Sequence, residues 1–263
     1  MRLAALAARL EERDGRLALS GAAKDQPNGW MQGRTMYGGA STYLAYRAVL
    51  SRFPDLPPLR AAQVGFVAPV LEDVAIEVSM LRQGRSVSQV TTDLYSDGAL
   101  AHRTLWLFGS ARPANAEVAP AQAFDFVPFE QTEPFAGHSD PGYFTHRFEQ
   151  RRAEIRGGLR VGAFRRWIRL RERDGMDAAG ELLAIADALP PGSARAMVRK
   201  GPVSSINWSM NLLGEAKPTR DGWWLVETAS NYAGDGFSSE TLRLWDADGA
   251  EVMRGLQSVA IFG

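Results

Sequence analysis

The sequence of 263 residues contains no cysteine and only three lysines, Lys24, Lys200 and Lys217. Without cysteine, the chain cannot form a disulfide framework, a zinc–thiolate site or a cysteine nucleophile. Arginine supplies the remainder of 30 basic side chains, and these are balanced by 30 acidic ones. A formal net charge of zero argues against a general affinity for nucleic acid or for an anionic membrane surface.

The sequence also lacks a segment that could cross a bilayer or direct secretion. Residues 3–8 are apolar, but this run is too short for a secretory core, and charged residues crowd positions 9–14. Leu3, Leu6 and Leu10 recur at helical spacing and predict a short helix packed on the surface. No other uncharged apolar run is long enough to span a membrane, so we expect a cytoplasmic protein.

Two common kinds of catalytic site are missing from the sequence as well. There is no Gly-x-Ser-x-Gly pentapeptide, as a serine hydrolase would need, and no cluster of His, Asp and Glu at metal-ligand spacing. The three histidines, His102, His138 and His146, have no recognisable setting and are interpreted as structural or surface residues. A serine hydrolase and a metalloenzyme are therefore disfavoured.

The pattern of apolar residues predicts a helix followed by antiparallel strands, and it does so twice. Residues 41–53 have helical periodicity, and the prolines after Phe53 end that helix. Alternating residues then predict a meander to residue 108, with a hairpin at Asp97-Gly98. A second helix is expected over residues 177–189. Further strands are expected over residues 143–155, 162–170, 205–213, 223–232, 237–245 and 251–262.

A proline-rich stretch separates these two parts of the chain. Residues 109–142 carry five prolines and few periodic apolar positions, which is the composition of a linker. We therefore predict an N-terminal unit over residues 1–112, a linker over 113–142 and a C-terminal unit over 143–263. Elements of this kind, a helix followed by a long antiparallel sheet, predict an α+β fold in which a curled sheet wraps the helix.

The two parts resemble each other in sequence, which favours an internal duplication. The segment Tyr95-Ser96-Asp97-Gly98-Ala99 aligns with Asp246-Ala247-Asp248-Gly249-Ala250. At the same offset, Arg103 aligns with Arg254 and Leu105 with Leu256. This alignment makes Trp106 the first-half counterpart of Gln257.

A charged residue, Asp187, lies near the end of the second predicted helix, which is otherwise apolar there. Burial of a carboxylate is unfavourable, and so is its position near the negative end of the helix dipole. One interpretation is a solvent-exposed helix end, and the other is a functional carboxylate kept at a position where packing would favour an apolar side chain.

Motifs distributed along nearly the whole chain resemble the acyl-CoA thioesterase II family and its thioesterase-like relatives, which share a double hotdog fold. In the first half they are Asn28-Gly29-Trp30, Tyr37-Gly38-Gly39, Phe66-Val67-Ala68-Pro69 and Leu81-Arg82-Gln83-Gly84-Arg85-Ser86. In the second half they are Ala186-Asp187-Ala188-Leu189, Ser204-Ser205-Ile206-Asn207-Trp208-Ser209-Met210, Trp224-Leu225-Val226-Glu227 and Leu256-Gln257. Their order and mutual spacing, more than any single motif, carry the resemblance.

The resemblance implies a catalytic group made of Asp187, Ser205 and Gln257. The family carries threonine where this chain has Ser205, so the hydroxyl is kept and the methyl that stiffens the rotamer is lost. A register slip of one residue would place Ser204 there instead, although the residues that follow favour Ser205. Asn207 stands where the family can carry aspartate.

These residue types suit hydrolysis of acyl-CoA thioesters by water, because a thioester carbonyl is already electrophilic. Asp187 would act as general base, and Ser205 and Gln257 would hold the water and the carboxylate. Gly38 and Gly39, at the start of the first helix, are candidate substrate-binding residues whose backbone N–H groups could meet the oxyanion. They could equally serve only close packing of helix on sheet.

The resemblance implies an acyl-CoA substrate and a mechanism without a cofactor. The charge balance and the missing ligand cluster predict no nucleic acid, no membrane and no metal as partners. A fused double hotdog already contains its pseudo-dimer, and a further homodimer is possible. A catalytically inactive acyl-binding or acyl-CoA-binding hotdog protein is the alternative. Arginines concentrate between Arg147 and Arg173. They could contact CoA phosphates, but their alternation with apolar residues favours a solvated strand face.

Overall fold

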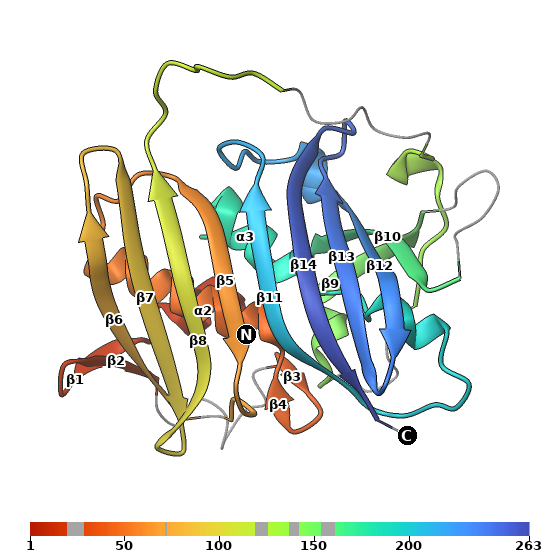
Figure 1. The fold of residues 1–263 in the computed structure, drawn as a ribbon, viewed down its shortest axis with the longest axis horizontal. Coiled ribbons are helices and arrows are strands. Elements are labelled where there is room, and N and C mark those ends of the chain that lie inside the picture. The colour runs from red at the N-terminus through yellow and green to blue at the C-terminus, as the bar shows by residue number, and fades with distance from the viewer. Residues whose placement is uncertain (20–28, 72, 119–125, 137–141, 154–160, 263) are drawn as a thin grey trace.

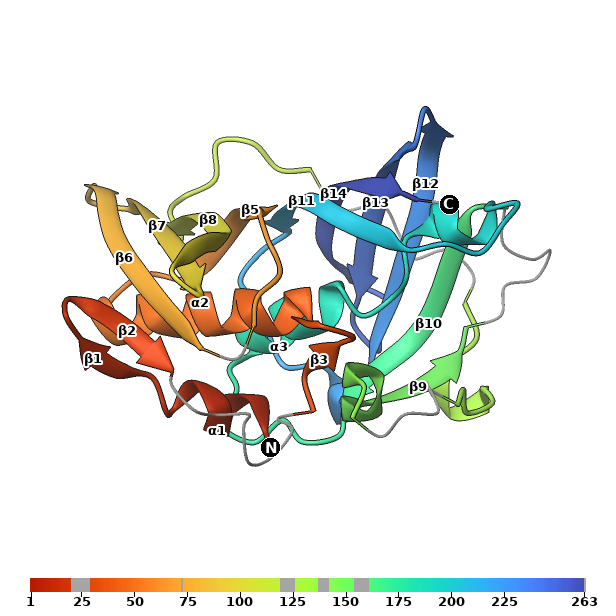
Figure 2. The ribbon, with the colours of Figure 1, turned by 90° about the horizontal axis from the view of Figure 1, so that it is seen from below.

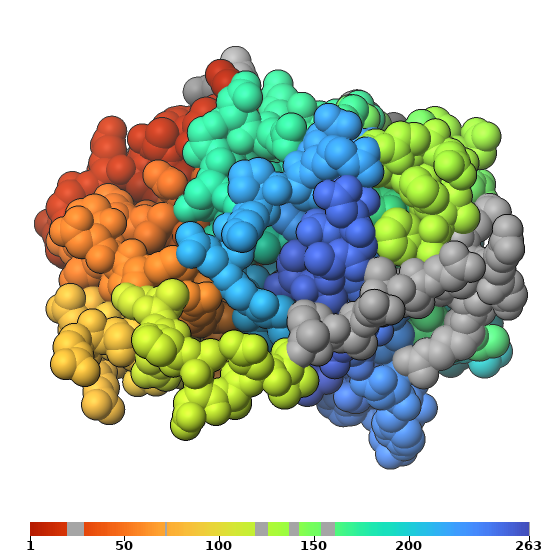
Figure 3. All heavy atoms as spheres, turned by 90° about the horizontal axis from the view of Figure 1, so that it is seen from above, coloured from red at the N-terminus to blue at the C-terminus, as the bar shows by residue number. Residues whose placement is uncertain are grey.

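Twelve strands in the described part of the chain form one continuous antiparallel sheet that curls around two helices (Figures 1 and 2). The structure is a computed structural model that describes residues 1–19, 29–71, 73–118, 126–136, 142–153 and 161–262. The sequence interpretations that concern Asn28, His138 and the arginines at positions 156 and 160, within the stretch from Arg147 to Arg173, fall outside these residues. The space-filling view shows the first half, in red to yellow, packed beside the second half, in green to blue (Figure 3).

Both halves contain a helix followed by strands, as the periodicity predicts. The first half consists of α1 (Leu3–Ala7), β1 (Glu11–Arg13), β2 (Arg16–Leu19), β3 (Met31–Gln32), β4 (Thr35–Met36), α2 (Gly38–Arg52), β5 (Leu59–Phe66), β6 (Val74–Gln83), β7 (Val87–Ser96) and β8 (Ala99–Gly109). The second half consists of η1 (Phe129–Gln131), η2 (Phe144–Arg147), β9 (Phe148–Arg152), β10 (Ala163–Leu170), α3 (Ala178–Ala186), η3 (Gly192–Arg195), β11 (Val203–Leu212), η4 (Arg220–Gly222), β12 (Trp224–Gly234), β13 (Phe237–Trp245) and β14 (Glu251–Ile261).

The sheet is built symmetrically around the pairing of β5 with β11. Outward from β5 the order is β8, β7, β6, β2, β1, and outward from β11 it is β14, β13, β12, β10, β9. The register shifts also match, since Arg60 is the extra residue in β5 and Ile206 is the extra residue in β11. Matching strand order and matching bulges support the internal duplication, and the architecture is the predicted double hotdog.

The two central helices run antiparallel to each other inside the sheet, where most of their residues are buried. The Tyr37 hydroxyl, just before α2, donates to the Ala184 carbonyl in the last turn of α3, at 2.8 Å. The Tyr46 hydroxyl, further along α2, donates to Asp177, which caps the start of α3, at 2.9 Å. The start of α2 therefore meets the end of α3, and a site at that junction draws on both halves.

Several local predictions need correction. Helix α2 begins at Gly38 rather than Ser41, strands β1 and β2 were not predicted, and α1 is buried against the core through Leu3 and Leu6. The strand predicted over residues 143–155 begins only at Phe148, because η2 precedes it. Apart from the start of α2, these differences fall on short elements whose apolar pattern is too brief to define their type.

Part of the predicted linker packs on the second half of the chain. Phe129 is buried and its ring lies 5.7 Å from that of Trp167 and 5.3 Å from that of Trp223. The backbone N–H of Phe135 donates to the Gln150 carbonyl of β9 at 2.8 Å, so this segment covers the edge of β9. Proline-rich composition correctly indicates irregular backbone here, but it does not reveal that the aromatic residues anchor it.

No helix in the described ranges has the length and hydropathy needed to cross a membrane. A search of the same ranges finds no group of three or more His, Asp or Glu side chains arranged to hold a metal ion.

Candidate active site

Asp187 ends helix α3 and its carboxylate lies against the start of α2. It is the residue at which helical geometry stops, and its side chain is partly buried. The backbone N–H of Gly39 donates a hydrogen bond to the carboxylate. The carboxylate also lies close to Gly38, since a Cβ placed on that glycine would come within 2.5 Å of Asp187 Oδ2. The glycine pair thus lets the carboxylate of one half approach the backbone of the other.

Strands β11 and β14 bring Ser205 and Gln257 to the same carboxylate. The Gln257 amide Nε2 donates to Asp187 Oδ1 at 3.3 Å and to Ser205 Oγ at 2.7 Å. Gln257 therefore connects the other two side chains. Ser204, the alternative hydroxyl, is exposed, and the Gln257 contact is to Ser205.

The environment of Asp187 raises the pKa of its carboxyl group from 3.8 to about 7. Loss of solvent around the carboxylate is the main cause, because burial penalises the charged form. Hydrogen bonds from Gln257 and from the Gly39 N–H oppose this rise without cancelling it. A carboxyl group with this pKa is about half ionised at neutral pH, which is the condition for accepting and returning protons.

Tyr37 fixes the relative position of the helix ends that meet at Asp187. Its ring is fully buried and stacks on Phe144, with the centroids 4.2 Å apart. Burial, reinforced by the nearby Asp187 carboxylate, raises the pKa of the Tyr37 phenol well above its usual range. The hydroxyl therefore stays protonated and donates to Ala184. Tyr37 was noted in the sequence only as part of a motif, and its role depends on a contact that no local pattern reveals.

The chain that follows Asp187 is held in place by buried polar groups. The backbone N–H groups of Gly192 and Ser193 donate to the buried Glu240 carboxylate, at 2.8 and 3.2 Å. The Thr228 hydroxyl donates to the Pro190 carbonyl at 2.7 Å. Because these contacts fix both Pro190 and the start of η3, the backbone on the C-terminal side of Asp187 has one defined path.

Asp187, Ser205, Gln257 and Gly38 line a pocket of about 920 Å³. Its walls come from both halves and are mainly apolar: Met36, Phe66, Val67, Ala68, Pro69, Val70, Phe135, Ala136, Tyr143, Phe144, Leu189, Pro190, Pro191, Pro202, Val203 and Ile206. A concave, largely apolar cavity with a few converging polar groups is the usual form of a small-molecule site. Gly39 is not part of this lining.

The equivalent position in the first half does not repeat the polar group. Trp106 occupies the place in β8 that Gln257 occupies in β14, and it is fully buried. Its Nε1 donates to Thr92 Oγ1 at 2.9 Å, and its ring lies 5.9 Å from that of Tyr46. Aromatic side chains thus fill the first-half position that is equivalent to Gln257. Among the described residues, the polar group of Asp187, Ser205 and Gln257 therefore occurs only in the second half.

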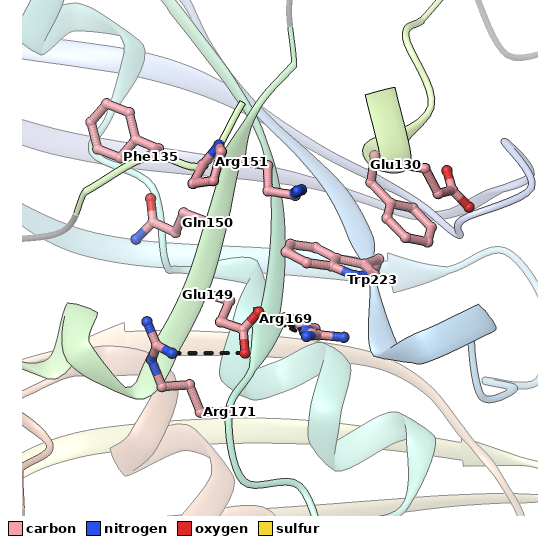
Figure 4. Close-up of a pocket in the computed structure, with 10 residues that line it drawn as sticks. Glu130, Phe135, Glu149, Gln150, Arg151, Arg169, Arg171 and Trp223 are labelled. Carbon is pink, nitrogen blue, oxygen red and sulfur yellow. Dashed lines mark hydrogen bonds and ion pairs between the residues drawn. The ribbon is translucent and has the colours of Figure 1, made fainter. Parts of the chain in front are cut away.

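Three arginines on β10 and just after it, Arg165, Arg169 and Arg171, form ion pairs with glutamates. Arg169 and Arg171 both approach Glu149, at 2.8 and 3.7 Å, beside a second pocket of about 430 Å³ (Figure 4). The Arg169 guanidinium also lies 4.7 Å above the ring of Trp223. Arg165 is paired with Glu227. Arg169 and Arg171 are partly exposed, as expected for a solvated strand face, whereas the Arg165 side chain is only 9% exposed and does not fit that interpretation.

Comparison with solved structures finds the same fold in other proteins. A hot dog fold protein of unknown function from Alicyclobacillus acidocaldarius aligns with a TM-score of 0.85 and 18% identity, over 100% of this chain and 99% of that one. An acyl-CoA thioesterase II from Mycobacterium marinum aligns with a TM-score of 0.76 and 16% identity, over 98% of this chain and 97% of that one. At these identities the comparisons show the fold alone. A search of curated proteins finds no match.

The family is shown by the sequence itself. Residues 26–109 match the acyl-CoA thioesterase N-terminal domain, and residues 117–261 match the acyl-CoA thioesterase C-terminal domain. Together these matches cover most of the chain, in the order that the double hotdog requires. The chain therefore belongs to the acyl-CoA thioesterase family.

Proposed function

We propose that this protein hydrolyses acyl-CoA thioesters to a free acid and CoA, with Asp187 as general base. The observation that carries the proposal is a carboxylate of raised pKa at the wall of an apolar pocket, hydrogen-bonded to Gln257 and to the Gly39 N–H. Membership in the acyl-CoA thioesterase family supports the same substrate class.

In this mechanism a water molecule held by Asp187 and Ser205 attacks the thioester carbonyl carbon. Asp187 takes a proton from the water as the carbon–oxygen bond forms. The tetrahedral intermediate then breaks its carbon–sulfur bond, and the departing thiolate receives the proton from Asp187. Because Gln257 donates to Ser205 Oγ, the serine hydroxyl hydrogen can itself be donated to the water oxygen.

The oxyanion of the intermediate needs hydrogen-bond donors at the pocket wall. The N–H groups in the first turn of a helix have no partner within the helix, and α2 begins at Gly38, which lines the pocket. Since the Gly39 N–H is directed to Asp187, the Gly38 N–H is the group we assign to the oxyanion. In this proposal the pair Gly38-Gly39 has both roles that the sequence suggests. It supplies backbone N–H donors, and its lack of side chains allows close packing.

Hydratase and dehydratase chemistry on the same fold would need a differently placed acid or a histidine. His102 is fully buried, and it contacts Thr42 and Thr104 rather than the pocket. Burial lowers its pKa to about 4, so it is neutral at physiological pH. This histidine supports the core under Phe66 and offers no general acid to the pocket.

The proposed function predicts a defined pH dependence of the rate. With a base of pKa about 7, kcat/KM should fall about tenfold per pH unit below pH 7 and reach a plateau above it, because only the ionised carboxylate accepts a proton. The measurement is release of free thiol from a panel of acyl-CoAs between pH 5 and pH 9. Absence of thiol release across the panel would contradict the proposed function and favour an acyl-binding protein.

Ser205 should contribute through its hydroxyl rather than through its size. Ser205→Ala removes one hydrogen-bonding group next to Gln257 and is expected to lower kcat/KM by about 10-fold. Ser205→Thr keeps the hydroxyl and restores the residue that the family carries, so it should stay within a few-fold of wild type. Equal activity of the alanine variant and the wild type would remove Ser205 from the mechanism.

A further inference from the structure

Arg166 lies on the inner face of the sheet and lines the same pocket as Asp187. Residues alternate between faces along β10, and Ile168 and Leu170 belong to the main core around the helices. Trp167 belongs to a separate cluster on the opposite face. Arg166 therefore shares the inner face with Ile168, whereas the ion-paired Arg165 and Arg169 lie on the outer face.

The guanidinium of Arg166 has no carboxylate partner among the described residues. Its contacts are a hydrogen bond from its Nη1 to Gln150 Oε1, at 2.8 Å, and the ring of Phe135, 3.4 Å below the guanidinium carbon. Gln150 and Phe135 line the pocket beside it. Arg165 and Arg169, its neighbours on the same strand, are by contrast each paired with a glutamate.

The surroundings of Arg166 make an unpaired charge costly. Burial, together with the positive charges of Arg152 and Arg195, lowers its pKa to about 10. It stays protonated at physiological pH, so a partly buried cation that has no carboxylate partner among the described residues faces a mainly apolar cavity. A group of this kind is best stabilised by an anion that enters the cavity, and a guanidinium stacked on a ring keeps its edge available for bidentate contact with oxygen.

We propose that Arg166, positioned by Gln150 and Phe135, binds an anionic oxygen group of the substrate within the catalytic pocket. The inference rests on the proposed function and extends it to substrate choice. Two parts of an acyl-CoA could supply the anion: a carboxylate at the far end of the acyl group, or a phosphate of the CoA. Either source would bring to Arg166 the negative charge that the described protein groups around it do not supply.

Three thioesters distinguish the two sources. They are an ω-carboxyacyl-CoA, the acyl-CoA of equal chain length that ends in a methyl group, and the same methyl-ended acyl group on N-acetylcysteamine, which carries no phosphate. Each is measured with wild type, with Arg166→Met, which keeps an unbranched apolar stem but removes the guanidinium, and with Arg169→Met as a matched control. Arg169 lies on the same strand but on the outer face.

If the acyl carboxylate is the ligand, Arg166→Met should lower the kcat/KM ratio of carboxyacyl-CoA to methyl-ended acyl-CoA by about 10- to 100-fold. If a CoA phosphate is the ligand, the same loss should appear in the ratio of methyl-ended acyl-CoA to its N-acetylcysteamine thioester. Arg169→Met should change neither ratio. Ratios within twofold of wild type in Arg166→Met would overturn the proposal.

Equilibrium binding separates this inference from the proposed function. If the wild type hydrolyses none of the thioesters, the proposed function fails, and calorimetry then tests the anion site with CoA and with a free α,ω-dicarboxylate. The anion site at Arg166 is supported if either anion binds the wild type and its affinity falls at least 10-fold in Arg166→Met but not in Arg169→Met. Equal binding by all three proteins, or no binding, would overturn it.

Discussion

Asp187→Asn is expected to lower kcat for acyl-CoA hydrolysis by on the order of 10² to 10⁴, because asparagine cannot accept the proton from water. The residual rate should lose the pH dependence centred near pH 7 that Asp187 confers on the wild type. Thiol release from the best acyl-CoA of the panel measures both effects. A variant as active as wild type, or one that keeps the same pH profile, would show that Asp187 is not the base.

The same substitution should make the folded protein more stable at neutral pH. Since the pKa of Asp187 rises from 3.8 to about 7 on folding, the native state binds more protons than the unfolded chain between about pH 4 and pH 7. The free energy of unfolding therefore falls as pH rises through this window, by at most about 4 kcal/mol. Asparagine carries no charge, so the variant does not lose this part of the free energy of unfolding as pH rises. Its side chain has only one acceptor oxygen, so it accepts fewer hydrogen bonds from Gln257 and Gly39.

We expect a net gain of about 1 to 3 kcal/mol for Asp187→Asn at pH 8, shrinking toward pH 4. Urea unfolding of both proteins at pH 5 and pH 8 measures the difference. The higher free energy of unfolding also serves as a control for misfolding. A variant that is inactive but more stable than wild type has lost a catalytic group and kept its structure. Lower stability of the variant at pH 8 would contradict a desolvated, ionised carboxylate at this position.

The overall fold could be predicted because its signals are local and repeated. Alternating apolar residues define β6 to β8 and β12 to β14, and the Asp97-Gly98 and Asp248-Gly249 turns align the two meanders. The structure shows the same register in both, with Trp106 opposite Ala62 and Gln257 opposite Trp208. Short elements such as β1 and η2 carry too few residues for such a pattern.

The candidate site could be predicted only in part. Asp187 stands out because a carboxylate at the end of an apolar helix conflicts with packing, and such conflicts concentrate at functional positions. Ser205 and Gln257 could be assigned only through resemblance, since serine and glutamine in strands have no distinctive pattern. Contacts between elements distant in sequence, such as Tyr37 with Ala184 and Phe135 with Arg166, could not be read from the chain at all.

Duplication explains why one site can be polar while its counterpart is filled. Each copy of the helix-in-sheet unit brings a helix end to the α2–α3 junction, but the proposed catalytic group needs only one such end. In the first-half copy, Trp106 and Tyr46 bury aromatic surface where Gln257 stands in the second. Burial of aromatic surface at the first-half position is favourable, whereas burial of the Asp187 carboxylate at the second-half position is costly.

Gly38→Ala is expected to lower kcat by about 100-fold while the fold remains intact. A Cβ at this position would lie 2.5 Å from Asp187 Oδ2 and 2.9 Å from Phe66 Cε1, so the carboxylate must move. A displacement of about 1 Å at a catalytic group can cost about 100-fold in rate. Alanine favours a helix by about 1 kcal/mol over glycine, so helix α2 itself should not be weakened.

The pH profile separates displacement of the carboxylate from a general loss of structure. Moving Asp187 away from the Gly39 N–H removes a hydrogen bond that holds its pKa down, so the apparent pKa of Gly38→Ala should rise above about 7. Gly65→Ala is the matched control, because its nearest contact would be the Arg103 carbonyl at 3.9 Å. Full activity of Gly38→Ala with an unchanged profile would mean that Asp187 does not need its close approach to α2.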